Sequence, residues 1–281
     1  MSKAAGKRRF GAHMSISGGV FNALTEAKGV GCDCAQIFVR NQRQWTAKAM
    51  AAEEVAQWEA ARTAMGIGPV VAHGGYLVNL ASPEEALWAK SIAACVDELG
   101  RCEVLGIEGL VVHPGAHMGR GEEAGLARVA AGLDRVFEAT AGLKARVLLE
   151  TTAGQGTCLG HRFDHLTAIL AGVRRPERLG VCMDSAHMFA AGYELRTAAG
   201  YAETMAAFDR AVGLERVACF HLNDSKPDLG SRVDRHDHIG SGRLGLEAFR
   251  LIVHDDRLAG VPMILRSEAH TSELQSRQVI S

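Results

Sequence analysis

Short apolar, β-branched runs alternate along the chain with longer segments of helical periodicity. This alternation is typical of repeated β/α units around a parallel sheet. The clearest helical segment is 83–105, where Leu87, Ile92, Val96 and Leu99 fall roughly on one helical face. Eight short runs predict strands, at Arg9 to His13, Ala35 to Val39, Pro69 to His73, Gly109 to His113, Arg146 to Glu150, Leu179 to Asp184, Val217 to His221 and Pro262 to Leu265.

The number of strands separates two fold classes that share this alternation. With 281 residues, of which 47% are hydrophobic, the chain can bury one large core. A doubly wound open sheet would also alternate strands with helices, but eight runs at this length favour a closed (β/α)8 barrel. The spacing is regular and no Pro/Gly/Ser-rich linker interrupts it. We therefore predict a single TIM-barrel domain.

Five consecutive predicted strands end in a side chain that can bind a metal ion: His73, His113, Glu150, Asp184 and His221. In a barrel these ends converge on the rim where active sites are built. A lone histidine at a strand end is more often a hydrogen-bonded rim residue, but five successive strand ends favour a metal centre. Imidazole and carboxylate donors suit zinc or manganese, and carboxylates can bridge two ions.

Two further segments add possible ligands. In GVCMDSAHMFAAGY, Asp184 and His187 are three residues apart at a strand-to-helix turn, so they can face one cluster and still serve different ions. In HLNDSKPDLGSRVDRHDHIG, Asp234 and His236 are two residues apart, and an extended backbone would point both the same way. Taken alone, this last stretch would be read as a charged, solvated loop. We expect His13 to orient a neighbouring side chain or to pack under the cluster rather than to bind metal.

Charge, cysteines and the N-terminus restrict the function classes. A formal net charge of −1 argues against binding nucleic acid through bulk positive charge. Seven cysteines without a C-x-x-C pair predict neither a disulfide framework nor a cysteine zinc site, so we expect reduced, mostly buried thiols. The basic start, MSKAAGKRRF, precedes no apolar run of signal-peptide or membrane-spanning length, and we expect a soluble, cytoplasmic protein.

These segments, with GAHMSISGG, NQRQW and HGGYLVNLAS, resemble the endonuclease IV family of zinc-dependent DNA-repair nucleases over residues 8–265, in order and at compatible spacing. The long HLNDSK motif is the most specific of them. The resemblance implies hydrolysis of the phosphodiester bond 5′ to abasic sites in double-stranded DNA by a zinc-activated hydroxide, which leaves a 3′-hydroxyl. We expect a monomer.

The resemblance also implies a trinuclear zinc centre in which Glu150, His113 and Asp184 are central to catalysis. Its ligands would be His73 and His113 for the first ion, Glu150 as the bridge to the second, Asp184 and His221 for the second, and His187, Asp234 and His236 for the third. Three zinc ions would add six positive charges and change the formal net charge from −1 to +5. The centre would thus remove the charge argument against DNA.

By the same resemblance, Arg43 in NQRQW and Tyr76 and Leu77 in HGGYL would enter DNA at the lesion. From the residues alone, Tyr76 and Leu77 could equally pack the third loop. The pair Gly74-Gly75 predicts a more flexible loop and a looser presentation of Tyr76.

The eighth run departs from the family pattern. The family run Pro-x-Ile-Leu-Glu ends in a glutamate that completes the second zinc site, whereas PMIL is followed here by Arg266. From there on nothing aligns with the family, and RSEAHTSELQS also resembles a translated sequencing adapter. We therefore divide the chain into a barrel domain, 1–265, with a truncated eighth β/α unit, and a tail, 266–281.

Two other functions stay open from the sequence. A metal-dependent sugar isomerase or epimerase shares the barrel and a metal-binding rim, but its chemistry does not call for the pair Asp234 and His236. A lesion-binding relic would follow if the second zinc ion lacked a ligand. Metal stoichiometry and substrate tests separate these functions.

Overall fold

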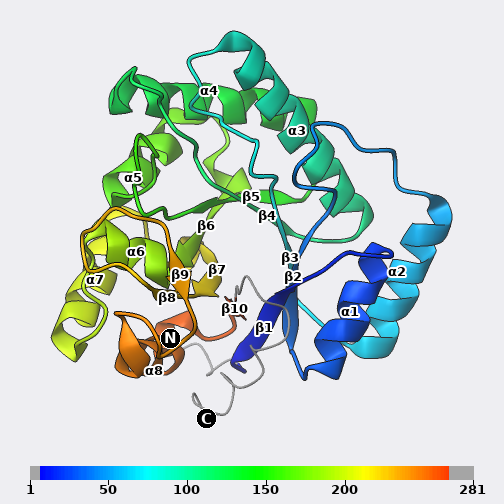
Figure 1. Cartoon of the computed structure of the whole chain (residues 1–281). Coiled ribbons are helices and arrows are strands. Elements are labelled where there is room, and N and C mark those ends of the chain that lie inside the picture. Colours follow the sequence, from blue (N-terminus) through cyan, green and yellow to red (C-terminus); the bar gives the residue numbers. More distant parts are fainter. Residues whose placement is uncertain (1–6, 266–281) are drawn as a thin grey trace.

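The eight predicted strands form a closed parallel barrel in this computed structural model, which describes residues 7–265 (Figure 1). Around the barrel the order is β1, β10, β7, β6, β5, β4, β3 and β2. Every predicted run ends within one residue of its strand, which confirms the TIM barrel. The bounds are β1 Arg9–Met14, β2 Cys34–Phe38, β3 Val70–His73, β4 Gly109–Val112, β5 Arg146–Glu150, β6 Leu179–Asp184, β7 Val217–Leu222 and β10 Pro262–Leu265.

Helices surround the barrel and cover its strands (Figure 1). Of the four apolar residues expected on one face of α3, Leu99 is fully buried, and Ile92 and Val96 are partly buried against the same core. The fully buried stripe runs through Cys95, Leu99 and Cys102, which share the i, i+4, i+7 spacing. The helices are α1 Val20–Gly29, α2 Ala52–Met65, α3 Glu85–Val104, α4 Glu122–Ala139, α5 Phe163–Gly172, α6 Ser185–Ala191, α7 Ala198–Ala211 and α8 Gly245–Val253, with 3-10 turns η1 Pro176–Arg178, η2 Leu214–Arg216 and η3 Asp256–Leu258. None of the helices within residues 7–265 is long and apolar enough to cross a membrane.

The barrel strands pack against two hydrophobic clusters, one inside the barrel and one between the strands and the surrounding helices. Residues such as Val70 and Ala72 belong to the large core between strands and helices, whereas Val71 between them belongs to a small cluster in the interior. This alternation follows from the two-residue period of a strand. The interior cluster consists of Cys34, Val71, Val111, Leu148, Cys182, Cys219 and Ile264.

A short antiparallel pair, which the sequence did not predict, shapes the loop after β7. The strands β8 (Asp224–Ser225) and β9 (His236–Asp237) pair with each other. The buried Asp224 carboxylate accepts the backbone N–H groups of Gly240 at 2.9 Å and Leu244 at 2.9 Å, which folds the long loop back on itself. This pair carries His236 toward the C-terminal rim of the barrel.

Candidate metal centre

Glu150 lies fully buried at the end of β5, and its two carboxylate oxygens face different histidines. Its Oε2 is 3.0 Å from His113 Nε2 and 3.2 Å from His73 Nε2. Its Oε1 is 3.0 Å from His221 Nδ1. A carboxylate placed in this way can bridge two cations.

His73 and His113, from the ends of β3 and β4, form the first ligand group with Glu150. His73 Nδ1 donates to Gly74 O at 2.8 Å, so the lone pair of its Nε2 faces the carboxylate. His113 Nε2 is buried, and within residues 7–265 it makes no hydrogen bond of acceptable geometry. Because lone pairs and a carboxylate that converge repel one another unless a cation lies between them, this group fits a metal ion.

Asp184 and His221 form the second ligand group with Glu150. Their Cα positions are paired across β6 and β7, and His221 Nδ1 is 3.6 Å from Asp184 Oδ2. This pairing follows a register shift: Val181 pairs with Val217, but the next residue pairs two positions further on, which leaves an extra residue in β7. Such an irregularity changes which side chains of a strand face a site.

Gln36, a fully buried residue of β2 that the sequence did not reveal, orients His221. Its Oε1 accepts from His221 Nε2 at 2.8 Å, and its Nε2 donates to His13 Nδ1 at 2.8 Å. Because His221 Nε2 carries this proton, Nδ1 presents its lone pair to the two carboxylates. His13 therefore orients a neighbour, as expected, through its contact with Gln36.

The third group joins His187 of α6 to Asp234 and to His236 of β9. His187 Nε2, His236 Nε2 and Asp234 Oδ1 form a triangle with all three sides 3.3 Å long. A tetrahedral zinc ion with bonds of about 2.0–2.1 Å holds its ligand atoms about 3.3 Å apart. His187 Nδ1 donates to Thr151 O at 2.8 Å, so its Nε2 is free to act as a ligand. The triangle therefore has the size that a zinc ion requires.

The buried carboxylates of Glu150 and Asp184 need nearby positive charge to stabilise their ionised forms. Burial acts to raise the pKa of each, but the adjacent histidines, His221 for Glu150 and His187 for Asp184, hold both pKa values below their usual range. Burial acts to lower the pKa of His187 and of His221, but the carboxylates raise both well above the usual value. The positive charge comes either from protons on these imidazoles or from metal ions bound among them.

Tyr76 and Leu77 lie on the loop after β3 and are exposed by 53% and 38%. Together with His73 and His113 they line a pocket of about 250 Å³. The Tyr76 ring centroid is 5.7 Å from that of His73, whereas Arg43 is exposed on the loop after β2. Tyr76 and Leu77 are therefore exposed apolar side chains directly beside the candidate ligands.

The loop after β3 is held by Glu98, a buried residue of α3 that the sequence did not reveal. Glu98 Oε1 accepts from Gly75 N at 3.0 Å and from Arg40 Nε at 2.9 Å. Gly74 N donates to a main-chain oxygen of β4 at 2.7 Å, and a Cβ at Gly74 would lie 2.9 Å from a valine of β4. Close packing thus explains Gly74, and the hydrogen bonds at both amides contradict the expectation of a loose loop.

His161 and His165 are buried in a separate group with Glu122. His165 Nδ1 accepts a backbone N–H at 3.1 Å, and its Nε2 lies 3.3 Å from Glu122 Oε2. Because Nε2 then carries the proton, this group is an internal hydrogen-bond network. His238 and His254, by contrast, are exposed.

Leu265, the last described residue, ends β10 and pairs with Ala12 and Leu222. Arg266, which the sequence places at the family's last ligand position for the second ion, lies outside the described residues, as does the tail 266–281. Within residues 7–265 the second group has three protein ligands, Glu150, Asp184 and His221.

Comparison with known proteins shows the family of the chain. A family model described as Xylose isomerase-like TIM barrel matches residues 24–280. The probable endonuclease 4 of Chloroflexus aggregans is 56% identical over 259 residues, 92% of this chain and 91% of that protein. That of Geobacter sulfurreducens is 49% identical over 261 residues, 92% and 87% of the two chains. Endonuclease IV from Thermus thermophilus matches with a TM-score of 0.86 and 39% identity over 97% of both chains. The chain therefore belongs to the endonuclease IV family of xylose isomerase-like TIM barrels.

Proposed function

We propose that this protein is a DNA-repair endonuclease that hydrolyses the phosphodiester bond 5′ to abasic sites in double-stranded DNA and leaves a 3′-hydroxyl. The observation that carries this proposal is the division of the Glu150 carboxylate between two ligand groups, with a third group of zinc size beside them. Two-ion sites of this kind act on phosphodiester bonds by in-line displacement.

The centre would hold three zinc ions. When bound, these ions supply a hydroxide near neutral pH and take up the negative charge that develops on the phosphoryl group. The ligands would be His73, His113 and Glu150 for the first ion, Glu150, Asp184 and His221 for the second, and His187, Asp234 and His236 for the third.

The side chains around the ligands keep them in one orientation. Asn223 Nδ2 donates to Asp184 Oδ2 at 2.6 Å, and Gln36 and Thr151 fix the rings of His221 and His187. Ligands held in this way do not need to reorganise when the phosphodiester binds, which favours reaction. Glu150, His113 and Asp184 are the residues on which incision depends most, and no protein nucleophile is needed.

The pocket rim would recognise the lesion. Tyr76 and Leu77 are placed to wedge into the base stack, and an abasic position lowers the cost of opening it because it offers less stacking. Arg43 would contact the phosphate backbone beside them. We expect a cytoplasmic monomer, with the positive charge of the metal centre facing DNA.

The test is purification, metal analysis and incision of a duplex that carries one stable abasic analogue, with the undamaged duplex as control. We expect two to three zinc ions per chain, because Arg266 would weaken the second site, and metal-dependent cleavage confined to the strand with the lesion. Turnover of a free sugar without binding or incision of the duplex would favour the isomerase. Binding of the abasic duplex without incision would favour a lesion-binding protein that has lost catalytic activity.

A further inference from the structure

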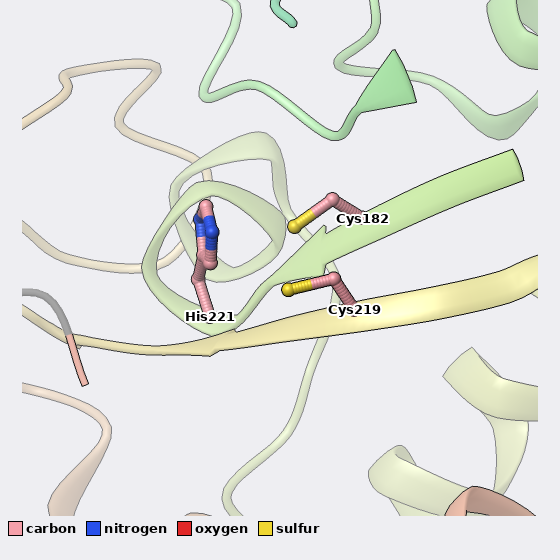
Figure 2. A group of neighbouring side chains, drawn as sticks. All are labelled: Cys182, Cys219 and His221. Atoms are coloured by element: carbon pink, nitrogen blue, oxygen red, sulfur yellow. The ribbon is translucent and has the colours of Figure 1, made fainter. Parts of the chain in front are cut away.

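Cys182 of β6 and Cys219 of β7 lie side by side in the barrel interior (Figure 2). Their Cα positions are paired across the two strands, and so are those of Asp184 and His221. Side chains two residues apart on a strand face the same way. The two thiols therefore form a layer directly beneath the second ligand group.

The thiols and His221 bring three metal-binding atoms together, as the converging side chains in Figure 2 show. The two Sγ atoms and a ring nitrogen of His221 lie within 4.8 Å of one another. Both cysteines are fully buried, and the interior cluster around them contains apolar residues such as Leu148 and Ile264. An ion that bound here would be shielded from water.

We propose that Cys182, Cys219 and His221 form a site for a soft, thiophilic metal ion such as Cd²⁺, which has only His221 in common with the zinc ligands. Two thiolates and an imidazole are softer donors than the carboxylates of the group above, so the site selects a different class of ion. Each thiol releases its proton to solvent as it binds. A divalent ion with two thiolates is neutral, which suits a buried position of low dielectric constant.

The site shares His221 with the second zinc position. A ring that turns toward the thiols turns away from Glu150 and Asp184, whose nearest oxygens are now 3.0 Å and 3.6 Å from Nδ1. A soft ion should therefore weaken the second zinc site. This consequence rests on the proposed function, whereas binding of the soft ion does not.

The experiment is a titration of the zinc-loaded protein with Cd²⁺ in the presence of a phosphine reductant. Binding is monitored by the near-ultraviolet charge-transfer absorption of cadmium thiolates. We expect the absorption to saturate at one Cd²⁺ per chain, with the release of zinc into a chromogenic chelator. Cys182→Ala and Cys219→Ala should each lower the affinity for Cd²⁺ by at least about 10- to 100-fold, because each removes one thiolate.

Two cysteines provide matched controls. Cys95→Ala removes a fully buried thiol of α3, and Cys158→Ala removes the half-buried thiol that lines the pocket. Both variants should keep the absorption. The proposal would be overturned if the wild type showed no cadmium–thiolate absorption, or if the absorption persisted in the Cys182→Ala and Cys219→Ala variants. Loss of the absorption in Cys158→Ala would also overturn it. The wild-type titration decides even if a variant does not fold, and incision without cadmium tests the proposed function separately.

Discussion

The contact between Gln36 and His221 leads to a specific prediction about the second zinc site. Gln36→Met keeps the length of this fully buried side chain but removes both of its 2.8 Å hydrogen bonds. His221 then loses the acceptor that holds its Nε2 proton, and the ring is no longer fixed with Nδ1 toward the two carboxylates. We expect the second zinc ion to bind more weakly while the first and third sites stay intact.

The size of the effect follows from burial. A buried N–H that loses its acceptor costs about 1–3 kcal/mol. Loss of a group that orients a metal ligand lowers metal affinity by about 10- to 100-fold. We therefore expect Gln36→Met to lower the zinc affinity of one site in three by that factor. Gln36→Glu, which keeps an acceptor for His221, should retain most of the affinity.

The assay is zinc content per chain at increasing concentrations of a competing chelator, together with incision of the abasic duplex. Wild type and Gln36→Glu should lose the second ion at similar chelator concentrations, and Gln36→Met at a lower one. Thermal unfolding of the metal-free proteins separates metal binding from general stability. If Gln36→Met holds all its zinc as tightly as the wild type, the reasoning about the orientation of His221 is refuted.

Four further substitutions test the ligand assignment. His113→Ala should empty the first site and abolish incision, whereas His117→Ala, which loses only the contact of its ring with Gly121 N at 3.0 Å, should change little; equal losses would show that the ligands are misplaced. Asp234→Ala opens one corner of the 3.3 Å triangle and should lower the zinc content by one ion per chain, and an unchanged count would remove Asp234 from the site. A guanidinium stays charged and cannot serve as a ligand, so Arg266→Glu should raise zinc content and incision together. If zinc content is already full and neither quantity changes, another group replaces the missing ligand.

The strands and the grouping of most candidate ligands were predictable because both depend on local pattern. Each apolar run of strand length is short and bounded, and a ligand such as Glu150 or Asp184 ends its run. The barrel then brings these ends together without any knowledge of individual contacts. Asp234 and His236, two residues apart in the sequence, do face each other, with His236 Nε2 3.3 Å from Asp234 Oδ1.

The residues that support the ligands could not be predicted, because their partners are distant in sequence. Gln36 contacts His221 across 185 positions, and Glu98 contacts Gly75 across 23 positions. A buried glutamine or glutamate looks like a solvated residue in a sequence, because burial of a polar group depends on partners that only the fold supplies.

The register between β6 and β7 determines the soft donor pair as well as the second ligand group. With Val181 opposite Val217, a regular ladder would place Cys182 opposite Ala218, and the two thiols would not meet. A shift of one position also turns each side chain to the other face of a strand. Because β7 accommodates Ala218 as an extra residue, Cys219 pairs with Cys182, and Asp184 and His221 pair above them. The carboxylate-rich group and the thiol pair are therefore two consequences of one backbone irregularity, and neither follows from the spacing of the cysteines in the sequence.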